Sequence, residues 1–352
     1  MAVSADKGTC VAPVRYAFRS FDRQWIIPDA RLLNQPNPTL WGLCSDLQLF
    51  MTAVTRKTIK NGPALTITDA IPDLDHYSGR GGRVFPLWGN AAGTHSNFSP
   101  KLVDALSQRY GKSVTAEDVF AYVAGIAANP AYTARFLSEL ATPGLRIPIT
   151  ANADTFAAIA AVGRRVVWLH SYGERMADAA EGRPPGPPRV SGESRPTMPK
   201  QGAMPPADML PEAICYDEAE QRLHFGKGFI DNVIPAVWKY EVDGKQVVSQ
   251  WFSYRRRDRS KPVMGDKRPP SPLQGIQPDH WPAEYTTDLL NLLNVLTLLV
   301  DMEPEQTSLL AQVCEGAIIS EVDLKAAGAI GAFEENAGQA SLLMDEKQAA
   351  LF

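Results

Sequence analysis

A proline-rich stretch in the middle of the chain limits most strongly what this protein can fold into. Residues 182–211 hold nine Pro and four Gly among thirty positions. Because proline lacks a backbone donor and fixes φ, neither a helix nor a central strand tolerates this density. The stretch therefore predicts a linker or long loop within a chain of 352 residues, which is long enough for two folded parts.

The residues before this linker change character near position 98. Residues 1–98 form short extended segments rich in β-branched and aromatic residues, ending in a glycine-rich loop between Asp75 and Phe98. Residues 99–181 instead show apolar spacings of three and four, which are typical of helices. Helix-start signals stand at Ser99-Pro100, Thr115, Pro130 and Asp154. We predict a β-rich part followed by an all-helical block.

The residues after the linker mix both kinds of element. Residues 212–316 show a strand-turn-strand pattern and an Asp243-Gly244 turn, and then two helices, one from Thr286 and one opened by Glu303-Pro304. Residues 317–352 are predicted to be a frayed tail. The predicted fold class is α+β, with short-strand regions flanking a central helical block and a helical pair near the C-terminus.

The net charge of −4 combines two opposite regions. Residues 279–352 hold 13 acidic side chains and two Lys, which gives −11, whereas residues 1–278 hold 33 basic and 26 acidic side chains, which gives +7. The most basic stretch, residues 239–268, has nine cations and four anions. Such a block attracts polyanions through counterion release, although a solvated surface is the commoner explanation of a charge run.

Composition and patterning argue against several classes of protein. An apolar fraction of 45% with 21% charged residues is typical of a globular protein. The longest apolar run, residues 289–300, is too short to cross a membrane, and the N-terminal residues lack a secretion signal, so we expect a cytoplasmic protein. The cysteines and histidines have no metal-ligand spacing, so we expect reduced thiols and no metal site. They are Cys10, Cys44, Cys215, Cys314, His76, His95, His170, His224 and His280.

One motif suggests catalysis. Asn129-Pro130-Ala131-Tyr132 is similar to the Asn-Pro-Pro-Tyr motif of methyltransferases that act on the exocyclic amines of bases, in which Asn binds the amine and Tyr stacks on the flipped base. Such an enzyme also needs a glycine-rich loop after a strand to bind S-adenosylmethionine, and the sequence shows none. The preceding residues follow a helical pattern, so a junction between two helices explains the motif better.

Three sets of cations beside aromatic or glycine residues are candidates for binding nucleic acid. Guanidinium groups bind phosphate in a bidentate manner and aromatic rings stack on bases. The simpler alternative is solvation with local ion pairs, to Asp258 in the first set or to Asp22 in the second. The second set would share one face in strand geometry, and the third lies in the glycine-rich loop. The sets are Arg255, Arg256, Arg257, Arg259 and Lys261; Arg15, Arg19 and Arg23; and Arg80 and Arg83.

Five segments, in order between about residues 13 and 316, carry a family resemblance. Together they resemble the C-terminal specificity domain of Type ISP restriction-modification enzymes, single polypeptides that combine nuclease, helicase, adenine methyltransferase and target-recognition parts. The chain departs from the family pattern at Ser20, where the family has Pro, and in the proline-rich insertion. The segments are RYAFRSFDRQWIIPD, GGRVFPLW, EDVFAYVAGIAANPAYTARF followed by LRIPIT, VWKYEVDGKQVVSQWFSYR, and LLNLLNVLTLLVDMEPEQ.

The resemblance implies recognition of double-stranded DNA without catalysis by this chain. We therefore expect a free-standing target-recognition protein of a restriction-modification or phage-defence system, with no cofactor of its own, acting with a methyltransferase, nuclease or helicase subunit supplied in trans. Two alternatives stay open. The first is an adenine methyltransferase that uses Asn129, Tyr132 and S-adenosylmethionine. The second is an assembly remnant that does not bind DNA and whose acidic C-terminal helices dock a partner.

Overall fold

The computed structural model describes residues 5–8, 11–55, 57–79, 82–142, 144–206, 208–256 and 278–329. Contacts along and across the chain divide it into two compact units. Unit 1 consists of residues 1–186, 242–244 and 303–352, and unit 2 consists of residues 187–241 and 245–302. Within the described ranges, no helix combines the length and the apolar character that crossing a bilayer requires.

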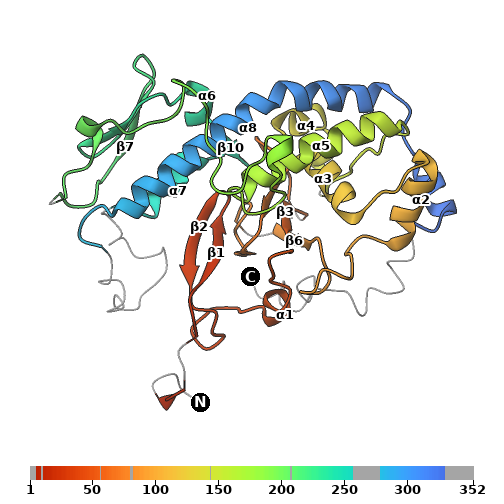
Figure 1. Cartoon of the computed structure of the whole chain (residues 1–352), viewed down its shortest axis with the longest axis horizontal. Coiled ribbons are helices and arrows are strands. Elements are labelled where there is room, and N and C mark those ends of the chain that lie inside the picture. The colour runs from red at the N-terminus through yellow and green to blue at the C-terminus, as the bar shows by residue number, and fades with distance from the viewer. Residues whose placement is uncertain are drawn as a thin grey trace. The chain divides into compact units, whose positions relative to one another are not determined.

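The first sheet of unit 1 is built on a hairpin near the N-terminus (Figure 1). Strand β1 (Val14–Arg19) pairs with β2 (Asp22–Ile26) in antiparallel fashion and with β5 (Ile71–Pro72) in parallel fashion. Only two residues, Ser20 and Phe21, connect β1 to β2. The sheet order β2-β1-β5 leaves β2 as an edge strand. The extended segments predicted in this part of the sequence are therefore present, and they form a tight hairpin.

The second sheet of unit 1 has β3 (Phe50–Val54) at its centre. Strand β3 is antiparallel to β4 (Leu65–Thr68) and to β6 (Gly82–Pro86), and both β3 and β4 are buried throughout. A short helix, α1 (Pro38–Trp41), starts at the cap residue Asn37 and contributes to the apolar cluster beside β3. The sequence predicted a glycine-rich loop where β6 lies. The segment forms a strand because its backbone N–H and C=O groups pair with those of β3.

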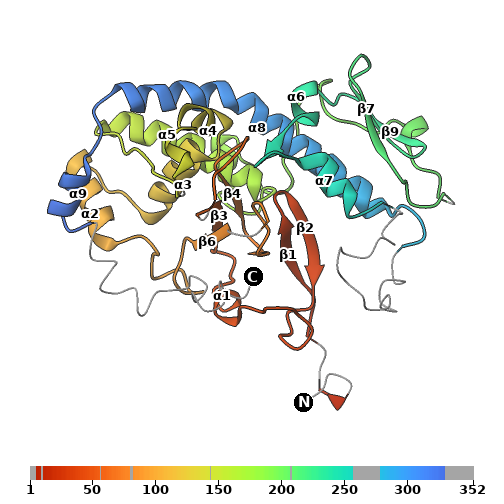
Figure 2. The ribbon, with the colours of Figure 1, turned by 180° about the vertical axis from the view of Figure 1, so that it is seen from behind.

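The helical block predicted after residue 99 is confirmed. Two of its helices, α3 (Ala116–Ala127) and α5 (Ala153–His170), lie against each other and against β4 (Figure 2). Helix α3 starts with a capping box formed by Thr115 and Asp118. The predicted cap Asp154 of α5 is wrong, because the side chain of Asn152 accepts the backbone hydrogen bonds instead. The other helices of the block are α2 (Pro100–Tyr110) and α4 (Pro130–Arg135), followed by a 3-10 turn at Glu139–Ala141.

Unit 2 contains an antiparallel meander of three strands followed by short elements. The predicted hairpin is present as β7 (Ile214–Asp217) and β8 (Arg222–Phe225), to which β9 (Gly228–Ile230) is added. The predicted turn is also present: Asp243 (φ 50°) and Gly244 (φ 73°), which are assigned to unit 1, adopt the left-handed conformation between the short strands β10 (Glu241–Val242) and β11 (Lys245–Gln246). The short helices are α6 (Pro235–Trp238) and α7 (Val247–Ser253).

The proline-rich stretch is irregular but has specific contacts. Within its described residues, the only helical segment is the 3-10 turn at Lys200–Gly202. The backbone N–H of Val190 donates to the side chain of Asn294 at 2.9 Å, and Val190 itself is buried. Helix and strand are absent there as predicted, while side chains from a distant helix supply the hydrogen bonds that regular structure would have provided.

The two predicted C-terminal helices form one helix, α8 (Ala283–Glu315), with Pro304 inside it. Proline removes one helical hydrogen bond, yet apolar residues on both sides of it, including Met302 and Leu310, are buried. Burial of this continuous apolar face outweighs the local loss. The predicted tail is also partly wrong, because α9 (Glu321–Ala326) starts with a capping box formed by Ser320 and Asp323.

Candidate nucleic-acid interface

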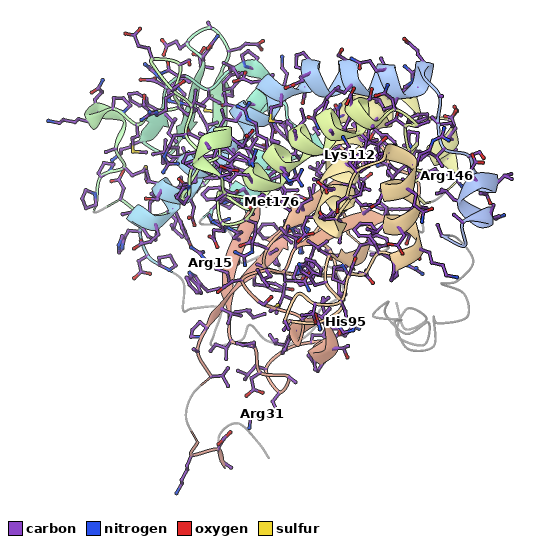
Figure 3. All side chains as sticks on the ribbon, turned by 45° about the vertical axis from the view of Figure 1, so that its right-hand side comes forward. Arg15, Arg31, His95, Lys112, Arg146 and Met176 are labelled. Carbon is purple, nitrogen blue, oxygen red and sulfur yellow. The ribbon has the colours of Figure 1, made fainter. Side chains whose placement is uncertain are left out.

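Arg15 and Trp25 form a cation-aromatic pair on the β1–β2 hairpin. The antiparallel register puts the two residues directly opposite each other, and the guanidinium carbon of Arg15 lies 4.4 Å from the ring centroid of Trp25. Trp25 is 64% exposed, and Arg15 is half-buried and forms no ion pair with the described residues. Figure 3 shows Arg15 on the hairpin. The pair thus offers a positive charge and an aromatic surface to a ligand.

Arg19 forms internal ion pairs instead. Its guanidinium group donates to the carboxylate of Asp73 at 2.7 Å and lies 3.9 Å from that of Asp75. The hydroxyl of Tyr16 also donates to Asp73, so Asp73, directly after β5, holds both the middle and the end of β1. The charge of Arg19 is compensated within unit 1, and its position holds β1 against β5.

Arg23 is also engaged inside unit 1. It donates to Glu174 at 2.7 Å, lies 3.9 Å from Asp69, and stacks over the ring of Tyr172 at 4.3 Å. Burial raises the pKa of Asp69 to about 6, and the nearby carboxylate of Glu174 acts in the same direction. These contacts anchor the hairpin to the residues that follow α5.

The predicted common face of the second cation set is only partly formed. Arg15 is opposite Trp25 and Ala17 is opposite Arg23, so these four side chains share one face of the hairpin. The register shifts between Ala17 and Arg19, which separates Arg19 from that face. The structure therefore brings Arg15 and Arg23 together, with only Arg15 free of an internal ion pair among described residues.

A second arginine and aromatic pair lies on β6, which is an edge strand. Arg83 and Phe85 are two positions apart and so point to the same side of β6. Phe85 is 38% exposed, while Arg83 is half-buried and has no ion pair with described residues. Arg80 of the same set lies outside the described residues.

The first cation set, which begins at Arg255, was predicted to bind a ligand as a group, but its first member is buried in the fold. Arg255 is only 4% exposed: its guanidinium group stacks on Trp251 at 3.8 Å and donates to the carbonyl oxygen of Trp251. This group belongs to an aromatic cluster of unit 2 that includes Trp281 and Tyr285. Arg256 is half-buried. The remaining members, Arg257, Arg259 and Lys261, lie outside the described residues.

The Asn129-Pro130-Ala131-Tyr132 motif is a helix junction, as the helical pattern around it predicted. Asn129 is fully buried and caps α4, and its side-chain oxygen accepts from the N–H of Ala131 at 2.9 Å. Tyr132 is 1% exposed and donates its hydroxyl hydrogen to the carbonyl oxygen of Arg146. Both side chains of the alternative methyltransferase site are thus buried, and each forms an internal hydrogen bond.

Histidine and cysteine side chains provide no metal site in the described part of the chain. His76 and His170 are buried in unit 1, where His76 hydrogen-bonds Thr52 and His170 accepts from the N–H of Ile67. Burial lowers the pKa of each imidazole to about 3, so both are neutral at physiological pH. Both histidines form hydrogen bonds inside unit 1.

The model of the Type ISP C-terminal specificity domain family matches residues 3–292. The chain belongs to this family. The match covers the β1–β2 hairpin, the helical block and most of unit 2, and it confirms the resemblance drawn from the five sequence segments. A search of the curated proteins finds no match.

Solved structures related to this specificity domain share its fold. A DrdV–DNA complex determined by cryo-electron microscopy has 16% identity and a TM-score of 0.59, over 85% of this chain and 28% of that one. A nuclease-deletion mutant of the Type ISP enzyme LlaGI with a DNA substrate mimic has 17% identity and a TM-score of 0.56, over 87% and 21%. The ATP-dependent Type ISP enzyme LlaBIII bound to DNA has 15% identity and a TM-score of 0.57, over 89% and 19%.

These likenesses confirm the α+β fold class, with small sheets beside helices. The specificity domain spans between 19% and 28% of the length of these three relatives.

The sequence did not identify the exposure of Trp25 or the ion pairs of Arg23. The partner of Arg23, Glu174, is 151 positions away along the chain, so no local pattern reveals this contact.

Proposed function

We propose that this protein recognises a target in double-stranded DNA as the specificity component of a restriction-modification or phage-defence system. The observation that carries the proposal is membership of a family of specificity domains over residues 3–292. The excess of basic side chains in residues 1–278, with 33 against 26 acidic ones, supports attraction to a polyanion.

In this proposal the DNA-contacting cations are those whose charge is not compensated internally. Arg15 on β1 and Arg83 on β6 fulfil this condition among the described residues, and each has an exposed aromatic neighbour. The other DNA-contacting cations of the proposal are Arg256, Arg257, Arg259, Lys261 and Arg80. Arg19, Arg23 and Arg255 instead stabilise their own units through internal contacts.

The catalytic step is proposed to come from methyltransferase, nuclease or helicase parts outside residues 1–352. The region shared with this chain makes up only 19% to 28% of the three solved relatives described above, which leaves room for such parts in those proteins. Recognition itself needs no cofactor, since base edges and phosphates are read by side chains and backbone groups.

A salt series tests the proposal. The full chain is titrated with mixed-sequence duplex DNA between about 50 mM and about 200 mM salt, and each phosphate that is neutralised contributes about −0.9 to the slope of log K against log salt concentration. We expect Arg15→Ala and Arg83→Ala each to reduce this slope by about 1. Arg165→Ala on α5 removes an exposed cation elsewhere in unit 1 and should leave the slope unchanged.

A combined variant tests the basic segment after α7. Arg256→Ala, Arg257→Ala and Arg259→Ala are introduced together, while Arg255 is kept because its removal would disturb the aromatic cluster of unit 2. Affinity for all duplex sequences should fall with a smaller salt slope. Absence of DNA binding by the wild-type chain would reject the proposed function, and unchanged binding by this variant would remove the segment from the interface.

A further inference from the structure

Trp25 has an unusual environment for its residue type. The chain has seven Trp, all within the described ranges, and Trp25 is the only one whose side chain ranks as exposed, at 64%. Burying a large aromatic side chain usually contributes about 2 kcal/mol or more to stability, so an exposed Trp forgoes that contribution. A binding role would account for its position on an edge strand.

The side chain is held in place before any ligand arrives. Trp25 lies near the end of β2, and the guanidinium group of Arg15 lies over its ring at 4.4 Å. On the same strand, Arg23 is fixed by Glu174 at 2.7 Å and by stacking on Tyr172. A rigid aromatic side chain binds with a small loss of conformational entropy, which favours affinity.

The neighbours of Trp25 indicate which ligand it fits. On its face of the hairpin the surrounding side chains are Arg15, Ala17 and Arg23, and Ala17 is buried. A protein partner that docks on apolar contacts needs a contiguous apolar patch, and two guanidinium groups interrupt such a patch here. A single aromatic ring next to an unpaired cation matches a nucleotide instead, because a base stacks on the ring while its phosphate pairs with the cation.

We propose that Trp25 stacks on a nucleobase that is unstacked from the bound DNA, while Arg15 binds the adjacent phosphate. This inference rests on the proposed function and assigns a positioning role to one residue of the interface. Inserting an aromatic or apolar side chain at a base step costs unstacking energy, and the cost is smaller where the base is already mispaired. Trp25 therefore favours DNA steps that open easily.

The test compares two duplexes of the same composition, one fully paired and one with a single mismatched step, in binding to the full chain. Wild-type protein should bind the mismatched duplex more tightly. Trp25→Ala should weaken binding by about 5- to 150-fold, the equivalent of one stacked base, and should lose the preference for the mismatch. Its salt slope should stay that of the wild type, since no charge is removed. Trp25→Phe, which keeps a ring, should retain most of the affinity and the preference.

A matched control is Leu137→Ala, which removes an apolar side chain that is 55% exposed, from the helical block of the same unit. It should bind both duplexes as the wild type does. Wild-type affinity and mismatch preference in Trp25→Ala would overturn the stacking role while leaving DNA recognition intact, and would assign the ring to a protein contact. A wild-type chain that binds neither duplex would overturn both the stacking role and the proposed function.

Discussion

At the scale of single residues, ion pairs decide which arginines are available to a ligand. Arg15 and Arg19 lie four positions apart on the same strand, yet Arg19 is bound by Asp73 at 2.7 Å and Arg15 is stacked on an exposed ring. Arg255 has the same aromatic neighbourhood in the sequence as Arg256 but is buried against Trp251. Residue type alone therefore gives candidates, and local geometry selects among them.

The buried histidines predict how stability responds to acid. His76 and His170 have pKa values of about 3 in the folded protein, because burial disfavours the imidazolium form, against 6.5 in an unfolded chain. The unfolded state thus binds more protons below pH 6.5, and the free energy of unfolding should fall as pH decreases, by about 1.4 kcal/mol per pH unit for each histidine. Above that pH the contribution is complete. Urea unfolding between about pH 7 and about pH 4.5 measures the slope.

Single-site variants separate the destabilising effect of the buried histidines in acid from the stabilising effect of protonating Asp69. The pKa of Asp69 is raised to about 6 in the folded protein, so protonation of Asp69 stabilises the fold as pH falls from that value toward 3.8. His76→Gln should therefore flatten the pH dependence, and Asp69→Asn should steepen it. Equal slopes in the wild type and both variants would contradict the assignment of these two groups.

At the scale of elements, one glycine allows two helices of the helical block to approach closely. A Cβ atom at Gly163 of α5 would lie 1.7 Å from the carbonyl oxygen of Ala121 in α3. The position of Cβ is fixed by the backbone, so no rotation moves it away from a backbone oxygen, and Gly163→Ala must separate α3 from α5. We expect it to lower the free energy of unfolding by about 1–3 kcal/mol or more, as measured by denaturant titration.

Gly42 provides the control for this substitution. It has a right-handed conformation, with φ −64°, at the end of α1, and a Cβ atom there would lie 3.5 Å from its nearest neighbour. Gly42→Ala should therefore change stability by less than about 0.5 kcal/mol, or raise it slightly. If both substitutions had the same effect, the close contact between α3 and α5 would not be the cause.

At the scale of the whole molecule, the uneven charge of the chain should modulate DNA affinity. Residues 330–352, which lie outside the described ranges, carry four acidic side chains and one Lys, a net charge of −3. A chain ending at Ala329 should bind duplex DNA severalfold more tightly at low salt, because like charge repels the phosphates. The difference should vanish at about 1 M salt, where the screening length is about 3 Å.

A full-length variant checks that charge is responsible for this change. Glu334→Gln, Glu335→Gln, Asp345→Asn and Glu346→Gln together neutralise the acidic side chains and keep the residues. This variant should bind as the truncated chain does. If only truncation raised the affinity, the effect of residues 330–352 would be steric.

The sequence by itself determined the helical block, the two β-rich regions, the irregular proline-rich stretch and the family, because these depend on local periodicity, turn residues and short ordered segments. It did not determine that α8 continues through Pro304, because burial on both sides of the proline outweighs one lost hydrogen bond. It also could not tell Arg15 from Arg23, since the carboxylate that holds Arg23 belongs to Glu174, far along the chain. Only the tertiary structure decided which cations and which aromatic ring remain available, because compensation of charge depends on residues brought together by folding.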